Sequence, residues 1–260
     1  MIGRYEAYMD GTALSAIDHS VMITDIRHNP ATIQRKTERM ASRPGSRDYG
    51  KTIGSASVVI TFEIHEYDPA KRQAICDKIA AWANYGTYLM TSDRLWKRLK
   101  CVCDKFPSVQ SAKKWTDPIT MTFSAYNPPF WQENNETRVT LGGMSGATSG
   151  RGSVFIPGNA EDALVSVTIT AKASISSVAL TVNGKTITLS GISLSSGDMV
   201  TIDYDDDMMM RIRKGSTSLM NKRTAASADD LKVNCGKQNG FSFTASGAAV
   251  VVFSARGWWY

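Results

Sequence analysis

The most regular pattern in the first half of the chain is an alternation of inward and outward positions between residues 57 and 66. The inward positions would be Val58, Ile60, Phe62 and Ile64, and the outward ones Val59, Thr61, Glu63 and His65. A period of two is typical of a strand that buries one face. We predict a strand there and, from the alternation of Ile119, Met121, Phe123 and Ala125, another at 119–126.

One helix is predicted at residues 69–84. Asp68 is a favoured N-cap, and Pro69 is a favoured first helical residue. Apolar residues repeat at helical spacing at Ile75, Ile79 and Trp82, and Gly86 lies where a C-terminal glycine cap belongs. A strand is predicted next, and one of its faces carries Leu95, Leu99, Cys101 and Cys103. Lys97 interrupts this apolar face. The order is therefore strand, helix, strand, strand.

Short strands joined by turns dominate the second half. The strongest local signal is Asn183-Gly184, because this pair tolerates the positive φ of a type I′ turn between strands 178–182 and 185–189. Further strands are predicted at 164–170, 199–204, 208–213, 231–234, 241–244 and 249–254. Their spacing is typical of an antiparallel sandwich or a jelly roll, and no helix is predicted there.

A Gly- and Ser-rich segment separates the two halves. Residues 142–153 contain five Gly and three Ser, and 260 residues suffice for two domains. We predict domains at 1–135 and 154–260, with a linker and first strand at 136–153. The fold class is mainly β: a β-barrel or sandwich with one α-helix, followed by an antiparallel β-sandwich.

Residues 27–50 show no sustained period. With Lys51, the segment carries seven basic residues against Glu38 and Asp48. Long segments without structure of their own are uncommon in compact domains and usually serve binding or assembly. Two interpretations stay open: an arm that binds a partner or a neighbouring subunit, and a disordered loop. The candidate contact residues of the arm are Arg35, Arg39, Arg43, Arg47 and Asp48.

The composition is that of a folded globular chain, with 42% hydrophobic and 21% charged residues. The net charge of +6 is concentrated in 27–51 and 94–105, and few aromatics lie among the bases, so no specific nucleic-acid binding is predicted. Membrane insertion is not predicted, because the longest apolar run, 248–253, is far shorter than the roughly 20 residues of a span. The N-terminus lacks the pattern of a signal peptide. The four cysteines are predicted to be free thiols of a reducing cytosol.

Three near-motifs of enzyme or ligand sites fail. Gly184-Lys185-Thr186 lacks the first glycine of a P-loop and begins a strand. The acids at 203, 205 and 207 have the opening spacing of an EF-hand loop, but Met208 and Lys214 replace the required Gly and Glu, so a turn between strands is predicted. Residues 143–147 depart from the nucleophile elbow. The histidines and cysteines form no zinc spacing. No catalytic residue, metal site or cofactor is therefore predicted.

Aromatic residues close both parts of the chain, Phe130-Trp131 the first and Trp258-Trp259-Tyr260 the second. Exposed neighbouring aromatics mark interfaces and sugar-stacking surfaces. Aromatics at chain ends equally serve to hold a terminus against the core. Trp131, Trp258 and Trp259 are therefore candidate interface residues, and both interpretations stay open.

The order of these features resembles the distal tail protein of long-tailed, siphovirus-like bacteriophages. The resemblance rests on three segments: Pro44-Gly45-Ser46-Arg47-Asp48-Tyr49-Gly50 before the strand 57–66, the capped helix ending near Trp82, and the strand 119–126 followed by Asn127-Pro128-Pro129-Phe130-Trp131. In many family members the first motif reads Gly-Arg-Asp-Gly, whereas Tyr49 intervenes here. The second half resembles the family's galectin-like or carbohydrate-module-like sandwich in size, strand count and the final Arg256-Gly257 followed by aromatics.

The resemblance implies a structural virion protein of the tail tip, assembled in the host cytoplasm. It implies a homohexameric ring whose first domains close into a β-barrel around a channel, with the second domains projecting outwards. The implied partners are other copies of the chain, the tail-tube protein, the tail-tip hub, and receptor-binding proteins or cell-surface glycans. The alternative is a sugar-binding module in residues 136–260 that acts in host attachment. An enzyme ranks third, because no catalytic motif is assembled.

Overall fold

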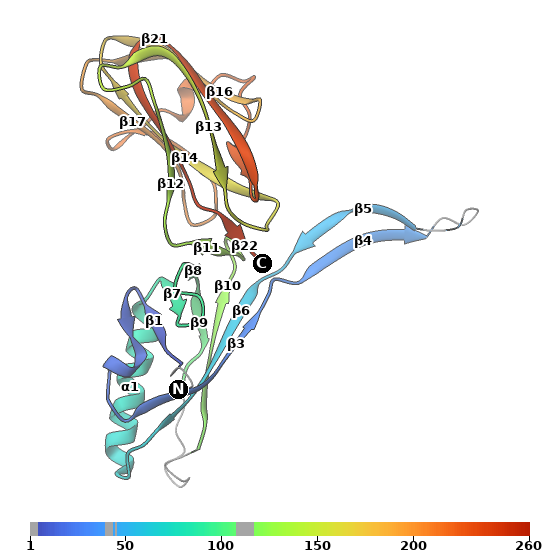
Figure 1. Cartoon of the computed structure of the whole chain (residues 1–260), viewed down its shortest axis with the longest axis vertical. Coiled ribbons are helices and arrows are strands. Elements are labelled where there is room, and N and C mark those ends of the chain that lie inside the picture. The colour runs from blue at the N-terminus through green and yellow to red at the C-terminus, as the bar shows by residue number, and fades with distance from the viewer. Residues whose placement is uncertain (1–4, 40–43, 45, 108–116) are drawn as a thin grey trace. The chain divides into compact units, whose positions relative to one another are not determined.

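The computed structural model describes residues 5–39, 44, 46–107 and 117–260. The chain divides into two compact units, Met1–Gln132 together with Tyr260, and Glu133–Trp259. Strands dominate both units, and α1 is the one α-helix among the described residues (Figure 1). The predicted fold class, mainly β with one helix in the first half, is confirmed.

The first unit contains two antiparallel sheets beside α1 (Figure 1). The first sheet includes, in this order, β2 (Thr12–Ala13), β1 (Ala7–Met9), β7 (Tyr88–Thr91) and β8 (Lys97–Lys100). The second has the order β3 (Val21–Asn29), β6 (Ala56–Ile64), β10 (Ile119–Ala125) and β9 (Val102–Lys105). A short 3-10 helix, η1 (Leu14–Ala16), precedes β3. Strand β11 (Trp131–Glu133) lies at the boundary between the units.

Strands β6 and β10 confirm the alternation in the sequence. Every second side chain of β6, from Ala56 to Ile64, is buried, and the side chains between them are half-buried. In β10, Met121 and Phe123 are completely buried, and the strand pairs with β6 through the register Phe123 to Val58. Burying one face of each strand removes apolar surface from water, which stabilises this sheet against the helix side of the unit.

Helix α1 (Pro69–Tyr85) begins where the sequence predicts, because the Asp68 carboxylate accepts a hydrogen bond from the backbone N–H of Ala70 at 2.9 Å. Its Trp82 ring meets Phe123 of β10 edge-on, with ring centroids 6.2 Å apart. Gly86 is the C-cap residue, as the sequence predicts, and its backbone is extended at φ −84°. Glycine is required there for space: a Cβ would lie 1.8 Å from Cγ of Met9.

The single strand predicted across Leu95, Leu99, Cys101 and Cys103 is wrong. The segment forms two strands in different sheets, β8 paired with β7 and β9 paired with β10. A turn, in which Arg94 N–H donates to Thr91 O at 2.9 Å, precedes β8 and leaves Leu95 exposed. Lys97 does not interrupt the apolar face, because its side chain is itself buried beside Leu99.

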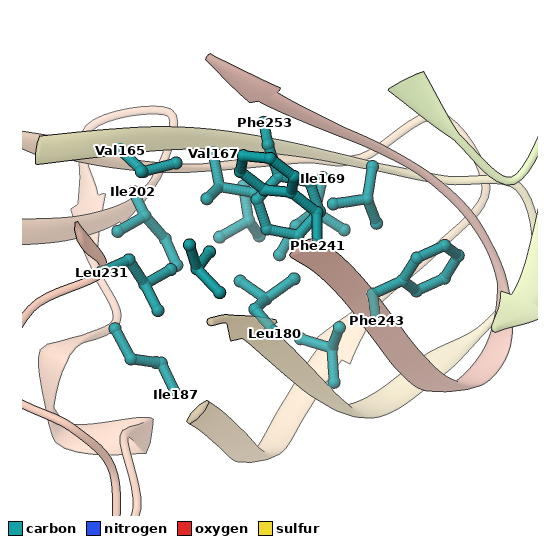
Figure 2. Close-up of a cluster of buried hydrophobic side chains, with 14 of the residues drawn as sticks. Val165, Val167, Ile169, Leu180, Ile187, Ile202, Leu231, Phe241, Phe243 and Phe253 are labelled. Carbon is teal, nitrogen blue, oxygen red and sulfur yellow. The ribbon is translucent and has the colours of Figure 1, made fainter. Parts of the chain in front are cut away.

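The second unit is an antiparallel arrangement of strands around one apolar core (Figure 2). Its strands are β12 (Thr137–Leu141), β13 (Ala147–Ile156), β14 (Asp162–Ala171), β15 (Ile175–Val182), β16 (Lys185–Leu194), β17 (Met199–Tyr204), β18 (Met210–Lys214), β19 (Thr217–Ser218), β20 (Lys232–Asn234), β21 (Lys237–Ala255) and β22 (Trp258–Trp259). A 3-10 helix that the sequence does not predict, η2 (Met220–Lys222), follows β19.

Strand β21 organises this unit, and it is one strand of 19 residues where the sequence predicts two. Its first part pairs with β13 and β15, and its last part pairs with β12 and β14. Gly247, in the predicted gap, lies so close to Ser174 that a Cβ would be 2.2 Å from its carbonyl oxygen. Phe241 and Phe253, from the two parts of β21, contact each other in the core with ring centroids 5.3 Å apart and planes tilted by 52° (Figure 2).

The Gly- and Ser-rich segment 142–153 is not a linker in the structure. Residues 147–156 form β13, which pairs with β21. Gly150 and Gly152 leave room for the side chains of Phe243, Leu141 and Val139, since a Cβ at either position would lie 2.8–3.3 Å from their atoms. Glycine therefore marks close packing here and not a flexible connection.

Two predicted turns are confirmed. Asn183 and Gly184 have φ of 49° and 81° and join β15 to β16, as a type I′ turn requires. The acids after β17 form a turn into β18, closed by Met208 N–H donating to Asp205 O at 3.0 Å. Asp203 faces Arg211 and Arg213, with N···O distances of 2.9 and 2.7 Å.

Candidate functional site

The basic segment predicted to be an arm or a disordered loop forms a two-stranded antiparallel ribbon, here called the arm. It consists of β4 (Ile33–Arg39) and β5 (Ser46–Ile53), which continue beyond β3 and β6 (Figure 1). Every residue of β4 is exposed, and so are six of the eight residues of β5. The sequence shows no alternation because the arm has no buried face.

A β-bulge sets the twist of the arm. Arg35 pairs with Lys51 and Thr37 with Asp48, so Lys36 alone opposes Tyr49 and Gly50. Gly50 has φ of +110°, which an L side chain rarely adopts, and the carboxylate of Asp48 accepts its N–H at 2.9 Å. The residue that separates this sequence from the Gly-Arg-Asp-Gly pattern, Tyr49, is thus accommodated as the extra residue of a bulge.

The predicted contact residues lie on both faces of the arm. Arg35 and Asp48 form an ion pair at 2.6 Å, and the hydrogen bond from Gly50 together with Arg35 lowers the pKa of Asp48. On the other face, Tyr49 donates to Glu38 at 2.7 Å, and the Arg47 guanidinium lies 5.3 Å from the Tyr49 ring centre. Arg39 is exposed near the end of β4. Arg43 lies outside the described residues.

These contacts alone hold the arm weakly. Exposed ion pairs contribute little, because solvent screens them, and an isolated two-stranded hairpin is marginal in water. Between residues 33 and 53 the sequence has six basic and two acidic residues, a net +4 out of the protein's +6. The arm is therefore suited to lie against an acidic surface, and arms of two copies would repel each other.

The root of the arm, residues 28–32 and 54–58, is held firmly. Gly54 N–H donates to Thr32 O at 2.8 Å, and Asn29 Nδ2 donates to Ser57 Oγ at 3.1 Å. His28 Nε2 donates to Asp93 Oδ2, in the turn between β7 and β8, at 2.9 Å.

Trp131 lies beside the root and is buried, with 3% of its surface exposed. Its ring is 5.2 Å from the His28 ring, edge-on, and the Arg94 guanidinium lies 5.3 Å from its centre. Trp258 is partly buried and packs against the core of the second unit, where its carbonyl accepts from Asn159 and Ala160 at 3.0 Å. Trp259 is half-buried. Trp131 and Trp258 therefore present no open stacking platform.

The second sheet of the first unit ends in two edge strands. In the order β3, β6, β10, β9, strands β3 and β9 each have one neighbour among the described strands. Val102 of β9 is 55% exposed. Edge strands expose unpaired N–H and C=O groups, which pair readily with another chain unless they are protected.

The second unit carries a groove of about 390 Å³ on its surface. It is lined by Thr140, Gly143, Met144, Thr170, Lys172 and Val250. None of these is aromatic, and Met144 is almost fully exposed on a glycine-rich turn. Two hydroxyls and one ammonium group are the polar functions that such a groove offers a ligand.

The described residues give little support for catalysis or metal binding. No group of three or more His, Cys, Asp or Glu that could hold a metal ion occurs among the described residues. The four cysteines are free, as predicted. Burial raises the pKa of Cys76 and Cys103 to about 11 and that of Cys101 to about 12, so these thiols are poor nucleophiles. No helix within the described ranges is both long and apolar enough to cross a membrane.

Comparisons with known proteins find similarity in structure and not in sequence. The sequence matches no protein-family model and no curated protein. The Dit protein (gp 19.1) of phage SPP1, described as a paradigm of the hub adsorption apparatus in phages that infect Gram-positive bacteria, superposes with a TM-score of 0.73 at 11% identity. The match covers 98% of this chain and 99% of that one.

Chains of the phage P2 baseplate are also similar. In the activated conformation with Ca, the TM-score is 0.54 at 11% identity, over 99% of this chain and 98% of that chain. In the conformation with Sr, the TM-score is again 0.54 at 11% identity, over 97% of both chains. The predicted resemblance to distal tail proteins is thus confirmed for the fold, over nearly the whole length of the chain.

Proposed function

We propose that the chain is a distal tail protein, a structural subunit that forms a homohexameric ring at the tip of a phage tail and joins the tail tube to the tail-tip hub. The observation that carries the proposal is the match to SPP1 Dit, which spans both units and leaves almost no residue of either chain uncovered. A shared single domain would support much less, because common folds serve many functions.

The sheet edges of the first unit suit a ring. Strand β3 of one copy and β9 of the next can pair, because they are the two ends of the same four-stranded sheet. Such a contact is heterologous, and it closes into a ring when the rotation between copies fits. Closure would leave neither edge of this sheet open, which is how barrels avoid aggregation.

The arm supports the same proposal. A ribbon with both faces exposed, weak internal contacts and a net charge of +4 gains stability only when it lies on another molecule. In the proposed ring that molecule is the neighbouring subunit, and Arg35, Arg39, Arg47 and Asp48 supply the contacts.

The test removes the arm without disturbing its root. Because Gly54 N–H already donates to Thr32 O at 2.8 Å, residues 33–53 can be replaced by Asn-Gly, which closes a two-residue hairpin between Thr32 and Gly54. Light scattering and electron microscopy of the full chain should show six-membered rings, and the shortened chain should stay monomeric while still unfolding cooperatively. Rings of the shortened chain would exclude the arm as the intersubunit contact. A full chain that remains monomeric even with tail tubes added would contradict the proposed function.

The groove of the second unit favours a second candidate function, glycan binding in host attachment. Its volume of about 390 Å³ lies within the usual range of ligand sites. Thr140 and Thr170 can hydrogen-bond sugar hydroxyls, and Lys172 can pair with an acidic group of the glycan. Host-wall glycans should bind the full chain and lose affinity in Thr170→Val and Lys172→Ala variants. If both variants bind the glycans as tightly as the wild type, this groove is not the binding site.

A further inference from the structure

His28 connects three segments of the first unit that are far apart in sequence. It belongs to the arm root on β3, donates to Asp93 in the β7–β8 turn at 2.9 Å, and packs edge-on against Trp131. Only 12% of its side chain is exposed. This one side chain therefore ties the arm root both to the first sheet and to the segment that leads out of the unit.

The surroundings of His28 disfavour its charged form. The charged groups that face it are Asp93, Arg94 and Lys97, so one carboxylate stands against two cations. Asp93 is shared, because Arg94 Nε lies 3.8 Å from the same Oδ2 that accepts from His28. The other ring nitrogen, Nδ1, is buried and has no hydrogen-bond partner among the described residues. A second proton would therefore place an unsatisfied N–H and a third positive charge in this site.

We propose that the contact between His28 and Asp93 is a pH-sensitive latch, which fixes the arm root while His28 is neutral and releases it when His28 gains a proton. Burial, assisted by Arg94, lowers the pKa of His28 below its ordinary value of 6.5. In the released state the imidazole of His28 is solvated and binds the proton more readily. The latch is thus fully effective above about pH 6.5 and weakens as the pH falls below it. Ring assembly through the arm should then weaken in acid, and this last step rests on the proposed function.

The test measures hydrogen exchange of the full-length chain between pH 7.5 and 5.5, corrected for the intrinsic pH dependence of exchange. Protection of amides in residues 28–32 and 54–58 should fall on acidification, by at most about tenfold at pH 5.5, because this pH lies one unit below the ordinary pKa of 6.5. His28→Gln keeps a neutral donor and should make the protection independent of pH. The matched control is His65→Gln, because His65 pairs with Glu63 at 2.8 Å on β6, outside the root, and this variant should behave as wild type.

Two results would overturn the latch: protection at the root that does not change with pH in the wild type, or a pH response that persists in His28→Gln. An NMR titration of the three histidines is an independent check that needs no folded variant, and a midpoint for His28 at or above 6.5 would also overturn it. Light scattering at the same pH values separates the two proposals. If protection of the root depends on pH but the chain forms no ring, the latch is supported and the proposed function is contradicted. If the chain forms a ring but protection of the root does not depend on pH, the proposed function is supported and the latch is contradicted.

Discussion

Nδ2 of Asn183 donates a hydrogen bond to Oδ1 of Asn239 at 2.7 Å, joining the tip of the β15–β16 hairpin to the start of β21. Asn239 is completely buried. Its Oδ1 also accepts from the backbone N–H of Asn234 at 2.7 Å, and its Nδ2 donates to the carbonyls of Asn234 and Lys237 at 3.0 and 2.8 Å. A buried amide with every polar atom satisfied favours one arrangement of these three segments.

Replacing Asn239 by Ala should destabilise the second unit. The backbone N–H of Asn234 and two carbonyls would lose their partner inside the protein, and each buried unsatisfied group costs about 1–3 kcal/mol. We expect urea unfolding of the full chain to show a loss of about 2–4 kcal/mol. Gln238→Ala changes the adjacent, exposed residue and should cost under about 0.5 kcal/mol. Equal effects of the two changes would show that the network contributes nothing.

Gly86→Ala should destabilise the first unit through crowding and not through backbone strain. The φ of Gly86 is −84°, which alanine adopts freely, but the new Cβ would lie 1.8 Å from Cγ of the buried Met9. Overpacking of this kind costs about 1–3 kcal/mol. The cost, measured by thermal and urea unfolding, should shrink in a Met9→Ala background, because the crowded atoms are then absent. The same cost in both backgrounds would indicate that the helix end, and not Met9, resists the substitution.

Lys97→Met should alter how stability depends on pH. Burial, assisted by Arg94, lowers the pKa of Lys97 from 10.5 to about 8. Between these values the unfolded chain binds more protons, so Lys97 makes the free energy of unfolding rise with pH. The variant should be more stable than wild type at pH 7, and its advantage should shrink as the pH rises from 8 towards 10.5. The difference between the two proteins is the quantity to measure, since the buried thiols titrate in the opposite sense. Two results would contradict the lowered pKa of Lys97: a stability difference between Lys97→Met and wild type that is constant with pH, or the same pH-dependent difference in Lys100→Met.

The elements that could be predicted from the sequence are those whose signal is local. Burial on one face of β6 leaves a period of two, and Asp68 with Pro69 marks the start of α1 by hydrogen bonding that involves only neighbours. The turn at Asn183-Gly184 follows from the φ values that these residues tolerate.

What could not be predicted depends on partners distant in the chain. Gly150 and Gly152 resemble linker residues until Phe243 and Leu141 are seen to cover them. The gap at Gly247 resembles a strand end until Ser174 is seen to approach it. The arm gives no periodic signal, because neither face is buried within one chain. Trp131 has the same sequence signal whether exposed or buried, and only the contacts with His28 and Arg94 decide it.

The exposed charges of the arm should matter for assembly and not for the stability of the single chain. Arg39→Glu with Arg47→Glu changes two exposed residues, so the unfolding free energy of the monomer should change by less than about 1 kcal/mol. Ring formation, followed by light scattering at low salt, should fall steeply, because the arm loses its positive charge on both faces.

A matched control reverses the same number of charges elsewhere: Lys185→Glu with Lys237→Glu changes two exposed residues of the second unit and should leave ring formation intact. Wild-type rings should also weaken as salt is raised, since screening acts on exposed charges. If the two double variants assemble equally well, or fail equally, the charge of the arm does not direct the contact, and shape alone must hold it.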